Sequence, residues 1–265
     1  MADGVDELTR FRLDGRVAVV TGGAGGIGTR LCEALAHVGA KVVVHGRDEA
    51  RAEALAARLR DTGAEALSVV ADVTRRDESD RLIKDTMDAF GRVDVLVGTV
   101  GGGAGGALHP AENYPDDAWD RIIDLNLRSA LLPAQAAARA MIAGGRGGRV
   151  LHYSSVRGQL GINQGFSAYV AAKGALDALT RQQATEWAKY KITVNAISPT
   201  FVATPQSSGL LEDQDFRRGL ESRIPLHRIA DTDDLVGASL LLCSDASSFI
   251  TGQILTVDGG LTASQ

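Results

Sequence analysis

Short apolar runs alternate with helical segments along almost the whole chain of 265 residues. Runs bounded by glycine or polar residues, which is typical of buried strands, occur at 17–20, 41–44, 66–70, 93–97, 149–153, 193–197 and 254–257. Segments with the apolar spacing of helices occur at 29–37, 49–60, 78–90, 116–142, 168–189 and 233–242. Such alternation favours right-handed crossovers between parallel strands. We therefore predict an α/β fold, a Rossmann-type doubly wound parallel sheet of seven strands with helices on both faces.

The length and composition indicate one domain over residues 1–265, because an α/β chain of this size with 45% hydrophobic residues can bury one large core. The segment 205–227 is richer in polar residues and has room for a small substrate lid. An ordinary long connection is the alternative, because composition does not distinguish a lid from a loop.

The charge and the cysteines exclude several classes of protein. A net charge of −5 argues against nucleic-acid and anionic-membrane partners, because both favour a basic patch. Residues 1–14 carry charges without an apolar core, and no apolar run reaches membrane-spanning length, so we expect a cytoplasmic protein. Cys32 and Cys243 are the only cysteines and form no Cys-x-x-Cys pair. We expect no disulfide framework and no metal site.

A glycine-rich turn follows the first expected strand and leads into a helix. Two registers fit it: Gly23, Gly25 and Gly28 match Gly-x-Gly-x-x-Gly, whereas Gly22, Gly26 and Gly28, with Ile27, match Thr-Gly-x-x-x-Gly-x-Gly. Glycines in this position let the backbone approach a pyrophosphate, whose charge meets the positive end of the helix. The turn therefore predicts dinucleotide binding, with a plain loop as the alternative.

The end of the second strand carries the signal for cofactor choice. A carboxylate there would bind a ribose 2′-hydroxyl, but this strand ends in Gly46 and is followed by Arg47, a forked cation suited to a phosphate. We therefore expect NADP(H), with NAD(H) less favoured. Asp48 weakens the argument, because it could compete for Arg47 or turn toward the ribose. Asp72-Val73 ends the third strand, where the carboxylate could bind adenine or cap the next helix.

Tyr169 and Lys173 stand four residues apart in an expected helix, so the phenol and the ammonium share one face. A nearby positive charge favours the phenolate, and we expect Lys173 to lower the pKa of Tyr169. The pair then becomes a usable acid/base. A surface tyrosine beside a solvated lysine is the alternative, and the upstream pair Ser154-Ser155 favours the catalytic interpretation.

Taken together, the motifs resemble the short-chain dehydrogenase/reductase family over roughly residues 13–260. The resemblance rests on Thr21-Gly22-x-x-x-Gly26-x-Gly28, Asp72-Val73, Leu125-Asn126-Leu127, Ser154-Ser155, Tyr169-x-x-x-Lys173, Asn195 to Thr204 and Val257-Asp258-Gly259-Gly260, in the family's order and spacing. The Ser154-Ser155-Val156-Arg157-Gly158 stretch and the C-terminal tail resemble family members of the gluconate 5-dehydrogenase-like or 3-oxoacyl-carrier-protein reductase-like kind.

The resemblance implies a Ser-Tyr-Lys triad extended by an asparagine. Tyr169 would exchange a proton with the substrate oxygen, and Ser155 would hold that oxygen, with Ser154 as the alternative hydroxyl. Lys173 would also bind the nicotinamide ribose, and Asn126 would hold a water that links Lys173 to solvent. Pro199, Val202 and Thr204 would lie beside the nicotinamide carboxamide. Asn126 as an ordinary helix amide and Thr204 as a helix cap are the alternatives.

Three features depart from the family pattern. Gly98-Thr99-Val100-Gly101 replaces the usual Asn-Asn-Ala-Gly after the fourth strand, so we expect an altered strand end, compensated by Thr99, and a roomier or more mobile floor near the cofactor. Thr200 follows Pro199 where glycine is usual. Ser155 lies fourteen residues before Tyr169, one more than the commonest spacing, which a loop can absorb.

The sequence and the resemblance together predict an NADP(H)-dependent oxidoreductase that interconverts a secondary alcohol and a ketone on a small polar substrate, a sugar acid or a 3-oxoacyl compound. The alternatives are an NAD(H)-preferring enzyme of the same family and a non-catalytic dinucleotide sensor. The resemblance also implies a homotetramer. Polar residues and aromatics are expected around the reacting carbon, at Arg157, Gln159, Asn163, Gln164, Phe166 and Phe201.

Overall fold

Seven parallel strands form one sheet in the order β3-β2-β1-β4-β5-β6-β7. The computed structural model describes residues 7–102, 108–163, 165–205 and 207–264. Its strands are β1 (Val17–Thr21), β2 (Lys41–Gly46), β3 (Ala66–Val70), β4 (Val95–Gly98), β5 (Gly148–Tyr153), β6 (Ile192–Pro199) and β7 (Ile254–Val257). The predicted fold class is confirmed, although β4 begins later than expected and β6 extends to Pro199.

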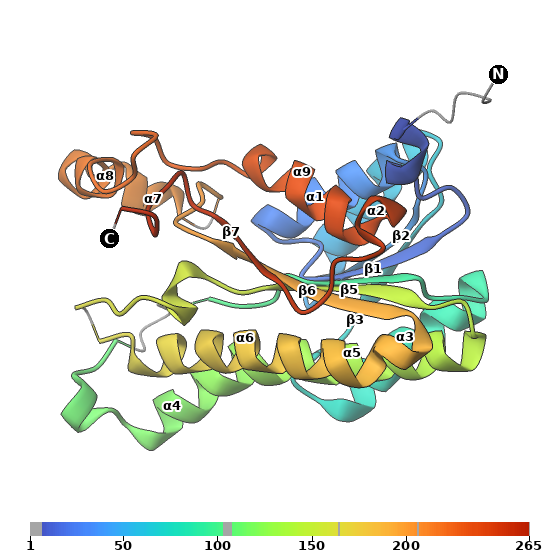
Figure 1. Ribbon diagram of the computed structural model, residues 1–265, viewed down its shortest axis with the longest axis horizontal. Helices are drawn as coiled ribbons and strands as arrows, with labels where there is room; N and C mark the ends of the chain where they lie inside the picture. Colours follow the sequence, from blue (N-terminus) through green and yellow to red (C-terminus); the bar gives the residue numbers. More distant parts are fainter. Residues whose placement is uncertain (1–6, 103–107, 164, 206, 265) are drawn as a thin grey trace.

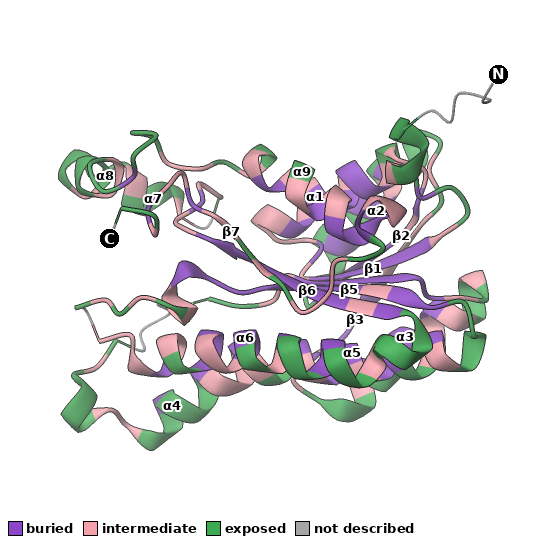
Figure 2. Ribbon diagram, in the orientation of Figure 1, coloured by how far each residue is buried: buried purple, intermediate pink, exposed green. Residues whose placement is uncertain are grey.

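Helices cover both faces of the sheet. On one face lie α1 (Gly26–His37), α2 (Glu49–Asp61) and α9 (Val236–Cys243), and on the other lie α3 (Arg76–Phe90), α5 (Ser129–Gly144) and α6 (Ser167–Trp187) (Figure 1). Alternate residues of β1 pack into two separate cores, with Ala18 and Val20 on the first face and Val17 and Val19 on the second. The central strands are therefore buried throughout (Figure 2).

Shorter elements lie at the ends of the sheet. Short 3₁₀ helices occur at Glu7–Phe11, Ala111–Asn113, Val156–Gly158, Ala188–Tyr190, Asp233–Leu235 and Asp245–Ser247. The described residues contain no helix that is both long enough and apolar enough to cross a bilayer.

The predicted helical segment at 116–142 is interrupted. The structure has α4 (Asp116–Ile123), a π-helical turn (Asp124–Arg128) and then α5. The wider turn carries Asn126, whose Nδ2 donates to the carbonyl oxygens of Ile122 (3.0 Å) and Gly102 (2.9 Å). Turns of this kind are frequent at functional sites, and apolar periodicity does not reveal them.

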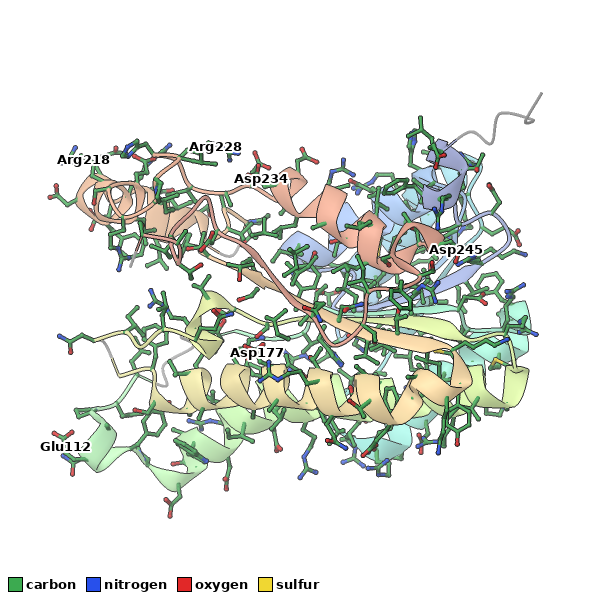
Figure 3. The ribbon with its side chains drawn as sticks, in the orientation of Figure 1. Glu112, Asp177, Arg218, Arg228, Asp234 and Asp245 are labelled. Carbon is green, nitrogen blue, oxygen red and sulfur yellow. The ribbon has the colours of Figure 1, made fainter. Side chains whose placement is uncertain are left out.

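The segment 205–227 forms α7 (Ser208–Leu211) and α8 (Gln214–Glu221), and it lies above the carboxyl end of β6 in Figure 1. Phe216 of α8 packs edge-on against Phe201, with ring centroids 5.9 Å apart. Beyond the segment, Arg228 and Asp234 form a two-bonded ion pair (Figure 3). The Phe201 contact therefore ties α8 to the residues that follow β6, and the role of the segment as a lid stays a prediction.

The unusual end of β4 is stabilised by two side chains. The Thr99 hydroxyl donates to the Thr21 carbonyl at 2.8 Å, as the predicted compensation requires, and the Thr99 amide donates to the same oxygen at 3.0 Å. Gly98 is paired with His152 of β5, and a Cβ at Gly98 would lie 3.6 Å from His152 Nδ1. That distance is an ordinary van der Waals contact, so the space beside Gly98 would accept a Cβ, and the expected roomier floor stays a prediction.

His152 is fully buried, and its Nε2 is 2.9 Å from Gln183 Oε1. Burial lowers its pKa from 6.5 to about 4. Between pH 6.5 and about 4 the unfolded chain therefore binds a proton at His152 that the folded chain does not bind. The neutral, buried His152 contributes fully to stability above pH 6.5, and this contribution is lost as the pH falls toward 4.

We predict that the free energy of unfolding decreases over that pH range by up to about 3 kcal/mol through His152 alone. Urea unfolding of the native protein and of His152→Gln from pH 7.5 to 4 measures this, because the substitution cancels only the His152 contribution. Two curves that run parallel over the whole range would contradict the prediction.

Candidate active site

The glycine-rich turn leaves no room for side chains at four positions, one of which is Gly23, where a Cβ would lie 2.9 Å from the Val20 carbonyl oxygen. Gly22 has φ +73°, and a Cβ there would lie 2.7 Å from Thr99 Oγ1. A Cβ at Gly28 would lie 2.1 Å from the Gly22 carbonyl oxygen, and one at Gly26 would lie 2.7 Å from Thr204 Cβ. Close contacts therefore favour glycine at every member of the second register and at Gly23 and Gly28 of the first, so they do not choose between the two registers.

His45 is hydrogen-bonded to the glycine-rich turn, and the sequence did not predict this role. Its Nδ1 accepts the Gly22 amide at 3.1 Å, and its Nε2 lies 2.9 Å from the Ala71 carbonyl oxygen. This pair of bonds requires the neutral ring with the proton on Nε2. Burial, the largest effect, lowers the pKa of His45 and so favours that form. The position of His45 near the carboxyl end of β2, where the turn must pass, could have indicated this role from the sequence.

The two carboxylates that the sequence left ambiguous are both bonded locally. Asp48 Oδ1 accepts the Arg51 amide at 3.1 Å and so caps α2. Asp72 Oδ1 accepts the Thr74 amide at 3.0 Å and the Thr74 hydroxyl at 2.7 Å, which lowers the pKa of Asp72. Because α3 has Arg75 as its N-cap, Asp72 forms a turn before the helix rather than its cap.

A cleft of about 510 Å³ joins these elements to the expected catalytic residues. Every predicted site residue except Asn126 lines it: Gly22, Gly26, Ile27, Gly28, Arg47, Asp72, Val73, Ser155, Tyr169, Lys173, Pro199, Val202 and Thr204. Further residues, which were not predicted as site residues, also line it: His45, Asp48, Arg51, Thr74 and Thr99. The cleft runs from the end of β2, past the glycine-rich turn, to α6.

Asn126 lies directly behind the cleft and is fully buried. Its Oδ1 accepts the Gly102 amide at 2.9 Å, so the side chain holds the Gly102 backbone through two bonds. A Cβ at Gly101 would lie 2.8 Å from Asn126 Oδ1 and 3.2 Å from Lys173 Nζ. Asn126 and Lys173 thus approach each other across a glycine, and the water-holding role of Asn126 stays a prediction.

Ser155 and Ser154 have different partners. Ser155 Oγ accepts the Arg157 amide at 3.1 Å and is hydrogen-bonded to Tyr169. Ser154 Oγ instead faces α6, with the Lys173 carbonyl oxygen at 3.4 Å, and it also bonds to Asp177. Of the two hydroxyls, Ser155 is the one positioned beside the phenol.

The expected lowering of the pKa of Tyr169 is wrong for this structure. Burial raises the pKa of Tyr169, and it outweighs the hydrogen bond from Ser155 and the charge of Arg157, which both lower it. The ring packs edge-on against Phe166, with centroids 6.2 Å apart. Lys173 Nζ lies over the ring, 5.7 Å from its centroid, and donates to the Tyr153 carbonyl at 2.8 Å. Tyr169 is therefore protonated at neutral pH.

Lys173 is itself buried, and burial lowers its pKa to about 8. The carboxylate of Asp177, one turn farther along α6, raises it. Asp177 is only 4% exposed, and its Oδ1 has no hydrogen-bond partner among the described residues. It lies on the side of α6 that faces the sheet (Figure 3). Asp177 thus supports the charge on Lys173, a contribution that the sequence interpretation missed.

The segment after β6 completes the cleft. Pro199, Thr200, Val202 and Thr204 line it, and the Thr204 amide donates to Ser207 Oγ at 2.9 Å. Thr200 is not among the described non-glycine residues with positive φ, so it takes the place of glycine without backbone strain. Of the residues expected around the substrate, Gln164 lies outside the described part of the chain.

This geometry, a doubly wound sheet with a glycine-rich turn and a Ser-Tyr-Lys set in one cleft, defines an oxidoreductase that acts on alcohols and ketones. A family model described as enoyl-(acyl carrier protein) reductase matches residues 22–262. The chain belongs to the short-chain dehydrogenase/reductase family, and the predicted resemblance is confirmed.

Relatives with known names match nearly the full length. A gluconate 5-dehydrogenase of Gluconobacter oxydans is 35% identical over 96% of this chain and 97% of its own. A 5-keto-D-gluconate 5-reductase of Escherichia coli is 34% identical over 95% and 97%. The crystal structure of a gluconate 5-dehydrogenase from Burkholderia cenocepacia, in complex with NADP and tartrate, is 38% identical with a TM-score of 0.90, covering 97% of this chain and 98% of that one.

We predict that the alkaline limb of the pH–rate profile reports Lys173 and depends on Asp177. Loss of the Asp177 charge removes a contribution that raises the pKa of Lys173, so Asp177→Asn should move the loss of activity to lower pH. The measurement is kcat/KM for carbonyl reduction from pH 6 to 10. Glu186→Gln, at an exposed position of the same helix, is the control. An unshifted limb in Asp177→Asn would rule out this coupling.

Proposed function

We propose that the chain is an NADP(H)-dependent oxidoreductase that interconverts a secondary alcohol and a ketone on a small polar substrate. The observation that carries the proposal is the shared cleft: the glycine-rich turn and Arg47 line one part of it, and Ser155, Tyr169 and Lys173 line another. Membership in the short-chain dehydrogenase/reductase family supports the same chemistry.

The residues of the cleft fit a dinucleotide. A backbone that excludes side chains at Gly22, Gly26 and Gly28 suits the approach of a pyrophosphate, and the first turn of α1 has no side-chain cap to compete for its amides. Arg47 supports NADP(H) over NAD(H), because Gly46 supplies no carboxylate for a ribose hydroxyl. The NADP of the Burkholderia relative favours the same choice. NAD(H) is the alternative cofactor.

Each side chain of the proposed active site has a separate role in the reaction. A bound nicotinamide supplies or accepts the hydride. Ser155 holds the substrate oxygen by a hydrogen bond, and in reduction the Tyr169 hydroxyl donates its proton to that oxygen, which becomes the alcohol. In oxidation the phenolate of Tyr169 takes the proton back. Because burial raises the pKa of Tyr169, the proton is present at neutral pH, which favours its use as an acid. Lys173 and Asn126 support the refilling of that proton.

We propose a sugar acid as the substrate class, with a 3-oxoacyl compound as the alternative. Two relatives are named for gluconate or its 5-keto form. Arg157 follows Ser155 closely and uses Nη1 to donate to the Gly161 carbonyl at 2.8 Å. It has no carboxylate partner within ion-pair distance among the described residues. Its remaining donors suit a substrate carboxylate.

Three wider features belong to the same proposal. The segment 205–227 acts as a substrate lid within a single domain, and its attachment to Phe201 supports this role. The protein works as a homotetramer, by analogy with its family. It acts in the cytoplasm, as its composition favours.

We predict that Tyr169→Phe retains NADPH binding but lowers kcat by a factor of about 10² to 10⁴, because only the proton donor is removed. Calorimetry measures the binding, and NADPH oxidation with 5-keto-D-gluconate measures the turnover. Tyr190→Phe, at an exposed position, is the matched control. Full turnover in Tyr169→Phe would reject the mechanism. NADPH binding by the native protein without turnover on any carbonyl compound would favour the dinucleotide-sensor alternative.

A second prediction separates the substrate classes. With 5-keto-D-gluconate and acetoacetyl-coenzyme A compared at equal NADPH, we expect the sugar acid to have the higher kcat/KM. Arg157→Ala should then raise KM for the sugar acid by about tenfold while kcat changes little, because a ground-state contact is lost. Preference for the thioester, or a KM that Arg157→Ala leaves unchanged, would contradict the assignment.

A further inference from the structure

Arg51 lies in the first turn of α2 and lines the same cleft as Arg47. Its Nη2 donates to the carbonyl oxygen of Ala24 in the glycine-rich turn at 3.0 Å. A guanidinium has five N–H donors in a fixed fork, so this single bond orients the group and leaves its other donors for a ligand. The side chain therefore joins α2 to the turn at the place where a dinucleotide would pass.

Neither Arg47 nor Arg51 has an acidic partner within 4.0 Å in the described part of the chain. The charge of Arg47 lowers the pKa of Asp72, but the two side chains form no close ion pair. The neighbouring acid, Asp48, directs Oδ1 to the Arg51 amide rather than to a guanidinium. The charges of Arg47 and Arg51 are thus both available to an anion in the cleft.

The strand end disfavours a side chain, and so a carboxylate, at residue 46. A Cβ at Gly46 would lie 3.1 Å from Ala24 Cβ, which is closer than most real contacts. Any side chain at this position would push against the glycine-rich turn. At the end of β2 a ligand therefore meets two guanidinium groups and no carboxylate from residue 46, while Asp48 and Asp72, which also line the cleft, are bonded to nearby amides and to the Thr74 hydroxyl.

We propose that Arg51 is a second specificity residue, which binds the 2′-phosphate of the adenosine ribose together with Arg47. The inference rests on the proposed function and extends it to a residue in α2. A doubly charged phosphate has acceptor oxygens enough for two guanidinium groups, and charge-assisted bonds of this kind are stronger than neutral ones. A ribose that carries only a hydroxyl gains little from Arg51.

The test compares ligands that differ only in the phosphate. Calorimetry gives Kd for NADPH and NADH, and for adenosine 2′,5′-bisphosphate and 5′-AMP, with the native protein, Arg47→Ala, Arg51→Ala, Arg51→Lys and the double alanine variant. Arg51→Ala should weaken NADPH and the bisphosphate by about tenfold or more and leave NADH and 5′-AMP within about twofold. Arg51→Lys should recover part of the loss, because it keeps the charge but not the fork.

Arg58→Ala is the control, because Arg58 lies on α2 away from the cleft and pairs with Glu33. Equal weakening of both members of each ligand pair by Arg51→Ala would overturn the inference, since Arg51 would then only hold the turn through Ala24. Unchanged affinity for all four ligands would also overturn it. Failure of the native protein to bind either dinucleotide would instead reject the proposed function.

Discussion

The parallel pairing of β1 with β4 determines where the site can lie. The chain leaves β1 toward β2 and β3, and then returns to β4 on the other side of β1, so the connections at their carboxyl ends run in opposite directions. Such a switch point opens a crevice at the sheet edge. Here the crevice depends on close contacts: the Thr99 hydroxyl and amide both bond to the Thr21 carbonyl, and only glycine fits at Gly22 beside them. The turn and the β4 end are therefore one unit.

Burial shifts the pKa values of the catalytic tyrosine and lysine more than the neighbouring charges do. Tyr169 and Lys173 share a helix face, yet burial raises the pKa of the phenol and lowers that of the ammonium, so both are displaced toward their neutral forms. Their charged neighbours act against this: Arg157 near the phenol and Asp177 near the ammonium. The result is a phenol that holds its proton and a lysine that retains its charge at neutral pH, which suits the delivery of a proton to a carbonyl oxygen.

Two buried histidines lie beside the elements that form the cleft. His152 lies beside Gly98 and its Nε2 is bonded to Gln183 of α6, while His45 joins the glycine-rich turn to the end of β3. Both are buried, and burial lowers the pKa of each. At the altered end of β4 the compensating bond is that of the Thr99 hydroxyl to the Thr21 carbonyl, and His45 holds the adjoining glycine-rich turn.

The amino-acid sequence by itself determined the seven-stranded doubly wound fold, because each apolar run is long enough for a buried strand and alternation leaves few topologies. It also identified the turn glycines and the Tyr169–Lys173 pair, whose spacing is local. Only the tertiary structure decided what depends on contacts between distant segments: the break of the 116–142 helix at Asn126, the role of His45 and the availability of Arg51. The direction of the pKa shift of Tyr169 could not be predicted from the sequence either. Desolvation depends on all the residues that pack around the ring, and most of these are distant from Tyr169 in the chain.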